Sequence, residues 1–354
     1  MKRKRSSINH PRIRFGVGLI LALWVTSYLV GAPFLYTTGG EGHSMITTHT
    51  TWETTTSRAG KHFFSSDVDL RGLLQARAND NVIVLTGFNF GYKDVFLNLL
   101  CQLDYLNLQN YVVAAFDVQG YDFCLAHGLP CFSATSVGMD SPEISDSELL
   151  HDSLPHAWTT DQFKKLTKRK SQEALRVLEL GYDILWTDVD VFWKSDPLGD
   201  ISKWMNDSAQ IHIQSDALWG IDPNSWVNSG FYFVRSSHQT INVFKDIISN
   251  SRTSNESEQP SFNRVLCQER VSPDECHNIQ HDVVTRVLDR ERYVHGASYH
   301  IYKDVTRQSR DNVIMFHANY RAGVQEKEEA LKAHGFWLLG NGCSYLEGKT
   351  NTPQ

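Results

Sequence analysis

Short apolar runs alternate with stretches of helical spacing from residue 81 onward. Asn81–Thr86 and Tyr111–Phe116 are continuous apolar runs of the kind that form strands buried on both faces. Between them, Asp94–Leu106 repeats apolar residues every three or four positions, which predicts a helix. Tyr121–His127 predicts a second, short helix that ends before Gly128. Strand, helix, strand and helix in this order predict an α/β domain containing a parallel sheet.

The same two patterns continue toward the C-terminus. Phe163–Leu180 predicts a basic amphipathic helix that ends at Gly181, and an apolar strand follows it at once. Further elements are predicted as strands at Ala209–Ile213, Phe231–Val234 and Val313–Phe316, and as a helix at Thr240–Ile248. The roughly 260 residues from 81 to 340 suit one α/β domain, with two smaller domains as the alternative.

An uncharged apolar segment, Phe15–Tyr36, lies near the N-terminus. Its length of about 22 residues is enough for a helix to cross a bilayer. Lys and Arg are concentrated in residues 1–14, and the next basic residue is Arg58. The positive-inside rule therefore predicts a signal-anchor with residues 1–14 in the cytosol and the rest in a lumen. The alternative is a cleaved signal peptide ending near Val30–Ala32, although its apolar core would span only about 7–15 residues.

Residues 37–80 are rich in Thr, Ser and Gly and poor in apolar side chains. A segment of this composition cannot bury enough apolar surface to fold, so we predict a stem that carries O-linked glycans. Residues 341–354 are predicted to be a C-terminal tail. The sequons at Asn206 and Asn255 agree with a luminal domain.

Charge and cysteine content exclude two classes of function. The net charge is −6, so nucleic acid is not an expected partner. The six cysteines include no Cys-x-x-Cys pair, which argues against a zinc site. In a luminal domain, Cys124 with Cys131 and Cys267 with Cys276 would each close a short loop, but the sequence leaves the pairing open.

The most informative segment is the apolar strand that runs from Gly181 into Asp188 and Asp190. If the strand continues, both carboxylates project from one face while Val189 and Val191 pack on the other. Two such carboxylates repel each other unless a cation lies between them, and oxygen ligands suit magnesium or manganese. At the carboxyl edge of an α/β sheet, this cation would lie where nucleotides bind.

Several ordered blocks around this pair resemble the nucleotide-diphospho-sugar transferase family, the GT-A glycosyltransferases that include plant and algal xylosyl- and arabinosyltransferases. The blocks are Val82–Thr86 with Asn89 and Gly91–Tyr92, the Lys170 helix with Leu178–Tyr182, Thr187–Val191, Gln214–Asp216, Val227–Tyr232, Glu258–Asn263, and His317–Gly323 with Lys327. The resemblance spans Asn81–Leu338. It implies a Rossmann-like mixed sheet flanked by helices, with the catalytic domain at 81–340.

The resemblance implies a metal site formed by Asp188, Asp190 and His317, with Asp188 also reaching the ribose of the donor. A set of carboxylates and an imidazole fits Mn²⁺, with Mg²⁺ as the alternative. Without the family block, a lone His317 would be interpreted as a hydrogen-bonded core histidine.

The resemblance also implies a binding site for a nucleotide sugar, with UDP as the expected nucleotide. Thr86, Asn89 and Tyr92 follow the first strand and would contact the uridine, although a plain turn is the alternative. Lys170 and Lys327 would each place a positive charge on phosphate, although lysines of this kind are often solvated.

The transferred sugar would lie near the remaining candidates. Asn228 and Gly230 would allow close approach of the donor sugar. Retaining relatives carry an Asp-Gln pair near the anomeric carbon, whereas this chain has Glu258 and Gln259. Gln259 would stabilise a cationic transition state, while Asp216 would bind sugar hydroxyls or the acceptor. The implied stereochemistry is retention.

The sequence thus predicts a metal-dependent glycosyltransferase of the Golgi membrane, with type II topology and a glycan or glycoprotein hydroxyl as acceptor. One alternative is an aspartyl-phosphate hydrolase that uses Asp188 as nucleophile, although Phe192 departs from that motif and no later Asp-Asp pair follows. The other is a non-catalytic, membrane-tethered protein that binds nucleotide sugars or glycans.

Overall fold

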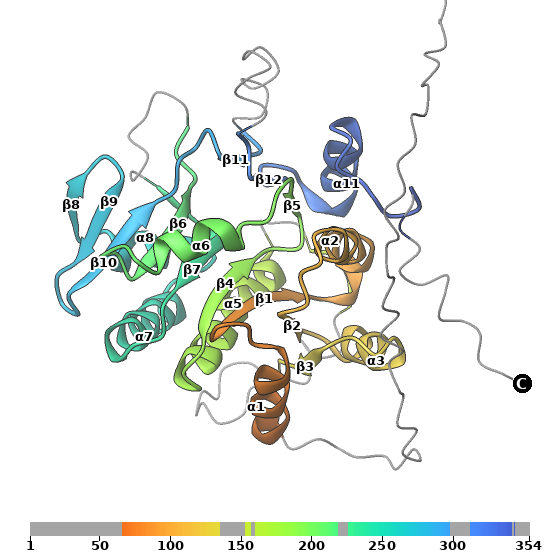
Figure 1. Ribbon diagram of the computed structural model, residues 1–354, viewed down its shortest axis with the longest axis horizontal. Helices are drawn as coiled ribbons and strands as arrows, with labels where there is room; N and C mark the ends of the chain where they lie inside the picture. Colours follow the sequence, from red (N-terminus) through yellow and green to blue (C-terminus); the bar gives the residue numbers. More distant parts are fainter. Residues whose placement is uncertain are drawn as a thin grey trace, which may run out of the picture. The chain divides into compact units, whose positions relative to one another are not determined.

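One mixed sheet passes through the described part of the chain, and helices pack against both of its faces (Figure 1). The computed structural model describes residues 66–134, 153–156, 160–218, 226–297, 312–341 and 343. The predicted cytosolic tail, the apolar segment 15–36 and most of the stem lie outside these residues. Among the helices that are described, none combines the length and apolar character needed to span a bilayer.

The sheet has nine strands in the order β3-β2-β1-β4-β7-β6-β10-β9-β8. In that order, the bounds are Cys131–Ser133, Tyr111–Ala115, Val82–Phe88, Asp183–Thr187, Val227–Val234, Ile211–Ser215, Val283–Val287, Glu275–Asn278 and Glu269–Ser272. Strands β3, β2, β1 and β4 are parallel, as the strand–helix alternation predicted. Strand β7 runs antiparallel to both β4 and β6, so the sheet is mixed. The α/β class and the mixed sheet are therefore confirmed.

Side chains of β1 alternate between two apolar clusters, one on each face of the sheet. Ile83 and Leu85 belong to one cluster, and Val82 and Val84 belong to the other. The first cluster also contains residues of α1, α5, α7 and α8, and the second contains residues of α2, α3, α6 and α11. The bounds of these helices are Ser66–Arg77 (α1), Lys93–Tyr105 (α2), Val118–Ala126 (α3), Asp161–Glu179 (α5), Leu198–Trp204 (α6), His238–Arg252 (α7), Gln259–Leu266 (α8) and Gly323–Ala333 (α11).

A second, three-stranded sheet has the order β11-β12-β5. Its strands are Tyr293–His295 (β11), Met315–His317 (β12) and Val191–Trp193 (β5). Strand β12 pairs antiparallel with β5 and matches His317 with Val191. This pairing brings the end of a late strand next to the residues that follow β4.

Two domain boundaries need correction. Helix α1 lies inside the range predicted as stem, and its Leu70 and Leu74 are buried in the core, so residues 66–80 belong to the folded domain. The predicted C-terminal tail also begins too early, because Cys343 is bonded to Cys101 of α2.

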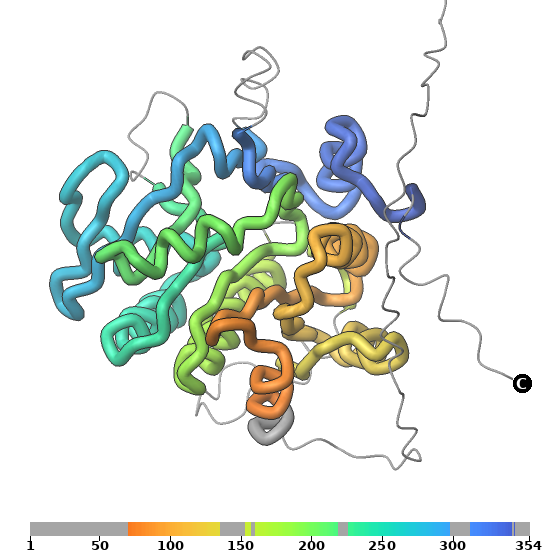
Figure 2. The backbone as a smooth tube through the Cα atoms, viewed as in Figure 1, coloured from red at the N-terminus to blue at the C-terminus, as the bar shows by residue number. Residues whose placement is uncertain are grey.

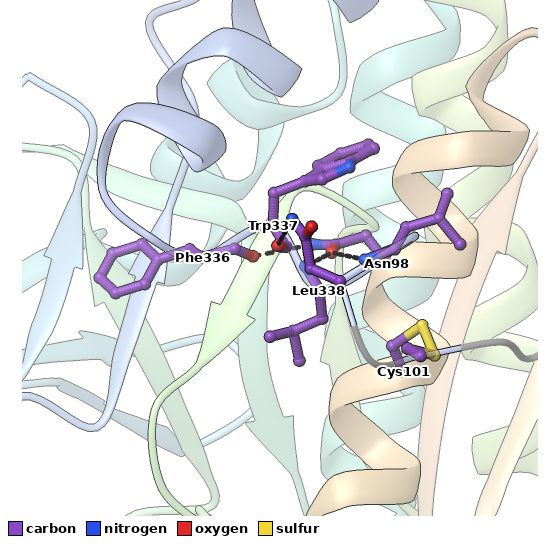
Figure 3. The surroundings of a disulfide bond; sticks show 8 residues. Asn98, Cys101, Phe336, Trp337 and Leu338 are labelled. Carbon is purple, nitrogen blue, oxygen red and sulfur yellow. Dashed lines mark hydrogen bonds between the residues drawn. A yellow bond between two sulfur atoms is a disulfide. The ribbon is translucent and has the colours of Figure 1, made fainter.

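Near the Cys101–Cys343 disulfide, the side-chain amide of Asn98 forms hydrogen bonds with the backbone of the same C-terminal segment (Figure 3). The buried side chain of Asn98 donates to the Phe336 carbonyl at 3.1 Å and accepts from the Leu338 amide at 2.6 Å. The segment that follows α11 is thereby fixed to α2, and the backbone in Figure 2 shows these distant parts of the chain lying next to each other. The other disulfides, Cys124–Cys131 and Cys267–Cys276, are the two short-loop pairs considered from the sequence.

Candidate active site

A cavity of about 740 Å³ opens at the edge of the sheet where β1, β4 and β6 end and β7 begins. Every residue proposed from the sequence for metal, donor or catalysis lines it except Thr86. Thr86 is fully buried and, by the alternation along β1, faces the side of Val84 under α2. The donor-binding role predicted for Thr86 is therefore not supported by its position.

Asp188 and Asp190 lie in a turn between β4 and β5, not on a continuing strand. Strand β4 ends at Thr187, and the Val191 amide donates to the Asp188 carbonyl at 3.3 Å. The Asp188 amide donates to the Gly230 carbonyl at 2.7 Å, which fixes the turn against β7. The expectation that one strand face presents both carboxylates is thus corrected, because a turn makes them converge.

The two carboxylates and His317 form a cluster with the geometry of a cation site. One ligand atom from each of the three residues lies within 4.8 Å of the others. His317 Nε2 is 3.3 Å from Asp190 Oδ1, and its Nδ1 is 3.0 Å from Gln214 Oε1. The Gln214 contact fixes the orientation of the ring, as outer contacts of metal-binding histidines commonly do. Two hard oxygen donors and one imidazole are a set that Mn²⁺ accepts.

Gly230 makes room for this cluster. A Cβ atom at this position would lie 2.5 Å from His317 Cε1 and 2.7 Å from Asp188 Oδ2. Both distances are shorter than the contacts that Cβ atoms make in proteins. The requirement for glycine is therefore steric, and it arises from the close packing of β7 against Asp188 and His317.

Lys170 on α5 connects Asp188 with Glu258. Its Nζ lies 3.1 Å from both carboxylate oxygens of Asp188 and 2.9 Å from Glu258 Oε1. Burial alone would lower the pKa of Lys170, but the two carboxylates outweigh it and raise that pKa above its ordinary value. Lys170 therefore carries a buried positive charge at the inner wall of the cavity.

Lys327 on α11 contacts Asp190 from the opposite side. Burial opposes ionisation of Asp190, but Lys327 and His317 hold the pKa of this carboxyl well below its usual range. Two ammonium groups therefore flank the acidic cluster, an arrangement that also suits the oxygens of a diphosphate.

Glu258 is almost fully buried and its carboxylate is engaged by its neighbours. Besides the Lys170 contact, Oε1 accepts from Ser229 Oγ at 2.7 Å, and Thr167 also donates to the carboxylate. Burial would raise the pKa of Glu258, but these partners lower it. Glu258 is thus held in an ion pair with Lys170, whereas a nucleophile is expected to have an unpaired carboxylate.

Asp216 accepts hydrogen bonds from four side chains. Asn228 Nδ2 and Asn319 Nδ2 each lie 2.8 Å from Oδ1, while Gln259 Nε2 and Tyr320 OH lie 3.0 and 3.3 Å from Oδ2. Roles for Asn319 and Tyr320 were not deduced from the sequence, although both belong to the block that begins at His317.

Asn89 and Tyr92 lie at the carboxyl end of β1, as predicted. Asn89 Nδ2 donates to the Leu154 carbonyl at 2.6 Å, and the Tyr92 hydroxyl donates to the His156 carbonyl at 3.3 Å. Their polar groups therefore hold the 153–156 segment against the cavity. Trp186, to which the sequence analysis assigned no role, donates from Nε1 to Asp188 Oδ1 at 2.9 Å.

Comparison with known proteins identifies the family. The family model described as nucleotide-diphospho-sugar transferase matches residues 106–331. The chain belongs to this family. The match includes the two aspartates, the Asp216 cluster and Lys327, and it agrees with the resemblance found in the sequence.

Among curated relatives, the chain is 31% identical over 280 residues to "Beta-arabinofuranosyltransferase RAY1" of Arabidopsis thaliana, covering 76% of this chain and 50% of the relative. It is 25% identical over 290 residues to "UDP-galactose:fucoside alpha-3-galactosyltransferase" of Dictyostelium discoideum, covering 75% and 44%. The chain thus spans about half the length of these relatives.

Similarity to solved structures is weaker. The galactosyltransferase LgtC with donor and acceptor sugar analogues has a TM-score of 0.42 and 11% identity, covering 77% of this chain and 97% of that protein. Mouse xyloside xylosyltransferase 1 has a TM-score of 0.37 and 11% identity, covering 68% and 98%. Values this low show nothing about the chemistry of the chain.

Proposed function

We propose that the chain is a metal-dependent glycosyltransferase that moves a sugar from a UDP-sugar to a hydroxyl group of a glycan or glycoprotein. The observation that carries the proposal is the convergence of Asp188, Asp190 and His317 in a cavity flanked by Lys170 and Lys327. Family membership supports the same reaction, and the names of the relatives favour pentose or galactose donors.

The cluster fits a divalent cation, which Asp188, Asp190 and His317 would hold. When bound, such an ion would neutralise negative charge on the departing diphosphate. Lys170 and Lys327 would bind phosphate oxygens from the two sides and orient the donor. Tyr92 and Asn89 would border the nucleotide at the end of β1, where α/β sheets bind nucleotides.

We propose transfer with retention through front-face attack, on the basis of the resemblance to retaining relatives. The bond between the anomeric carbon and the diphosphate oxygen would break as the acceptor oxygen bonds to the same face, and the acceptor proton would pass to the departing diphosphate. Gln259 is the residue best placed to stabilise positive charge on the sugar, because it lies between Asp216 and Ser229. A covalent intermediate on Glu258 is disfavoured by the buried ion pair of that carboxylate.

We also propose that the protein is a type II membrane protein of the Golgi with its catalytic domain in the lumen. The support is the apolar segment Phe15–Tyr36 with its preceding basic residues, together with the disulfides of the folded domain. Protease protection of the tagged full chain in microsomes tests the topology. Digestion of a C-terminal tag in intact vesicles would contradict it.

The decisive experiment is an assay of the full chain, purified in detergent, with Mn²⁺ and a panel of UDP-xylose, UDP-galactose, UDP-arabinofuranose and UDP-glucose. We expect metal-dependent release of UDP from one donor, and faster release when methyl glycosides are added as acceptors. UDP binding without turnover of any donor would favour the non-catalytic binding protein. A phosphate group trapped on Asp188 would revive the hydrolase, which the family match does not support.

A further inference from the structure

Two exposed aromatic residues line the cavity, and each is hydrogen-bonded to Asp216. Trp226 is 40% exposed and Tyr320 is 50% exposed, whereas the other aromatic residues of the lining, within the described part of the chain, are more deeply buried. Trp226 is tied to Asp216 through its carbonyl, which accepts from the Asp216 amide at 2.8 Å. Tyr320 is tied to it through its hydroxyl, which donates to the Asp216 carbonyl at 3.1 Å.

Tyr320 is held in a conformation that is unusual for a bulky residue. Its φ of 58° lies in the left-handed region, which side chains with a Cβ rarely adopt. The preceding Asn319 is fixed from two directions, because its Nδ2 donates to Asp216 at 2.8 Å and its Oδ1 accepts from the Gly296 amide at 2.6 Å. Strain of this kind persists where the surrounding structure imposes it and often marks a ligand site.

One face of the Tyr320 ring is covered by the protein. The buried His295 ring lies 5.6 Å away at an interplanar angle of 36°. Half of the tyrosine side chain nevertheless remains exposed at the cavity, which leaves a supported aromatic surface for a ligand. Burial of the phenol, with Asp216 beside it, raises the pKa of Tyr320, so the hydroxyl stays a donor at neutral pH.

The aromatic pair is separated from the metal-binding cluster by residues that would face the transferred sugar. From Asp216, hydrogen bonds lead to Gln259 and from Gln259 to Ser229, which precedes Gly230 beside the metal-binding residues. A molecule bound on the aromatic pair would therefore lie next to the donor sugar.

We infer that Trp226 and Tyr320 form the acceptor subsite, where the sugar ring that receives the transferred residue stacks on aromatic surface. This assignment rests on the proposed glycosyltransferase function. The C–H groups of a sugar ring carry partial positive charge and pack against the negative face of an aromatic ring. Arg321, which follows Tyr320 and also lines the cavity, can donate hydrogen bonds to sugar hydroxyls. A nucleobase is the competing aromatic-stacking ligand, and the test separates the two.

The test compares Trp226→Ala, Trp226→Phe, Tyr320→Ala and Tyr320→Phe with a control, Tyr105→Ala, in the full chain. Tyr105 is 83% exposed and lies outside the cavity lining, so it matches the loss of exposed aromatic surface. Saturation-transfer NMR with diamagnetic Mg²⁺, UDP and a mixture of methyl fucoside, arabinofuranoside, galactoside and xyloside reports binding of the sugar ring. Calorimetry with UDP and Mn²⁺ reports the nucleotide separately, and thermal unfolding reports the fold.

We expect the wild-type chain and the control to bind at least one glycoside, and each alanine variant to lose about tenfold in affinity, equal to about 1.4 kcal/mol. The phenylalanine variants should keep most of the binding, and UDP affinity should change less than about twofold. Loss of UDP affinity in Trp226→Ala would show that this side chain stacks on the uracil base, and it would overturn the inference. Equal losses in Tyr320→Phe and Tyr320→Ala, unchanged glycoside binding in the alanine variants, or no glycoside bound by wild type, would also overturn it. Absence of UDP binding by wild type would instead contradict the proposed function itself.

Discussion

Lys170 and Glu258 form an ion pair inside the protein, with 2.9 Å between Nζ and Oε1 and with both side chains almost completely buried. The same ammonium group contacts both oxygens of Asp188, so it links this candidate metal ligand to the beginning of α8. The lysine orients Asp188, and the glutamate in turn orients the lysine. We therefore expect Glu258 to act by positioning Lys170 rather than by contacting the transferred sugar.

Replacing Glu258 with Gln tests this role. The variant leaves Lys170 with one carboxylate in place of two, and we expect the free energy of unfolding to fall by about 1–3 kcal/mol. Transfer activity should fall by no more than about tenfold, because the amide can still accept a hydrogen bond. Ser229→Ala, which removes one donor to the same carboxylate without changing charge, is the matched control. A loss of about 10⁴-fold in kcat, with an intact fold, would contradict the positioning role and indicate a nucleophile.

Asp190→Asn tests the cation site directly. The change removes a charged ligand but keeps the shape of the side chain, so we expect Mn²⁺ binding to be lost and transfer to fall at least about a hundredfold. Calorimetry with Mn²⁺ and circular dichroism measure binding and fold. Asp94→Asn, on the exposed side of α2, is the control that should change neither. Full metal-dependent activity in Asp190→Asn would exclude the proposed site.

Gly230→Ala tests the steric argument. The added methyl group would contact His317 and Asp188 at distances below van der Waals separation, so we expect loss of Mn²⁺ affinity and destabilisation of about 1–3 kcal/mol. Gly199 on α6 has no atom within 4 Å of the added Cβ, so Gly199→Ala should be neutral or stabilising by up to about 1 kcal/mol. Equal behaviour of the two variants would show that β7 can move away from the cluster at little cost.

The local pattern of apolar and polar residues predicted the elements whose formation depends on their own sequence. The strands predicted at 81–86 and 111–116 are found as buried strands at Val82–Phe88 and Tyr111–Ala115, and the two aspartates that follow β4 do converge with His317. What the sequence did not predict depends on pairing over long distances. Strands β11 and β5 have three residues each, too few to show a period, whereas β12 overlaps the strand predicted at Val313–Phe316. Helix α1 was assigned to the stem because its sequence is mostly polar, with few apolar residues to bury.

The roles of individual site residues depend on which face of an element they occupy. Thr86 lies one position from Gly87, which lines the cavity, yet the alternation of the strand turns the threonine away. Glu258 and Gln259 are adjacent, but one points into an ion pair and the other toward Asp216. Neighbouring residues of the same motif therefore make different contacts, and only the packing around each side chain shows which contacts it makes.

His212 makes the stability of the domain depend on pH. Its ring is buried, stacks on Trp204 at 5.2 Å, and lies 3.2 Å from Asp207; burial lowers the pKa of His212 to about 4. Because the unfolded chain titrates near 6.5, protonation favours the unfolded state. The contribution of His212 is therefore complete above about pH 6.5 and is lost as pH falls toward 4, by up to about 3 kcal/mol.

Urea unfolding of the wild type, His212→Gln and His238→Gln between pH 4 and 7.5 measures this dependence. His212→Gln should make the free energy of unfolding depend less steeply on pH between 4 and 7.5. Replacement of the exposed His238 should leave this pH dependence unchanged. Hydrogen bonds from Arg286 lower the pKa of Asp207, so its own protonation acts at still lower pH. An unchanged pH dependence of the free energy of unfolding in His212→Gln would show that other groups control stability in this pH range.

The disulfide between Cys101 and Cys343 connects the segment after α11 to α2, and α11 carries Lys327. Its two cysteines are 242 residues apart, compared with 7 for Cys124 and Cys131. Because the entropy lost by the unfolded chain grows with the length of the closed loop, Cys101→Ser/Cys343→Ser should destabilise more than Cys124→Ser/Cys131→Ser, by about 2–3 kcal/mol. The first variant should also raise the KM for the nucleotide sugar, since the segment after α11 would lose its covalent attachment to α2 (Figure 3). Thermal unfolding and donor kinetics on both double variants measure these effects, and equal losses in the two would show that noncovalent contacts, such as the Asn98 hydrogen bonds and the stacking of Phe336 on Phe192, are enough to hold this segment.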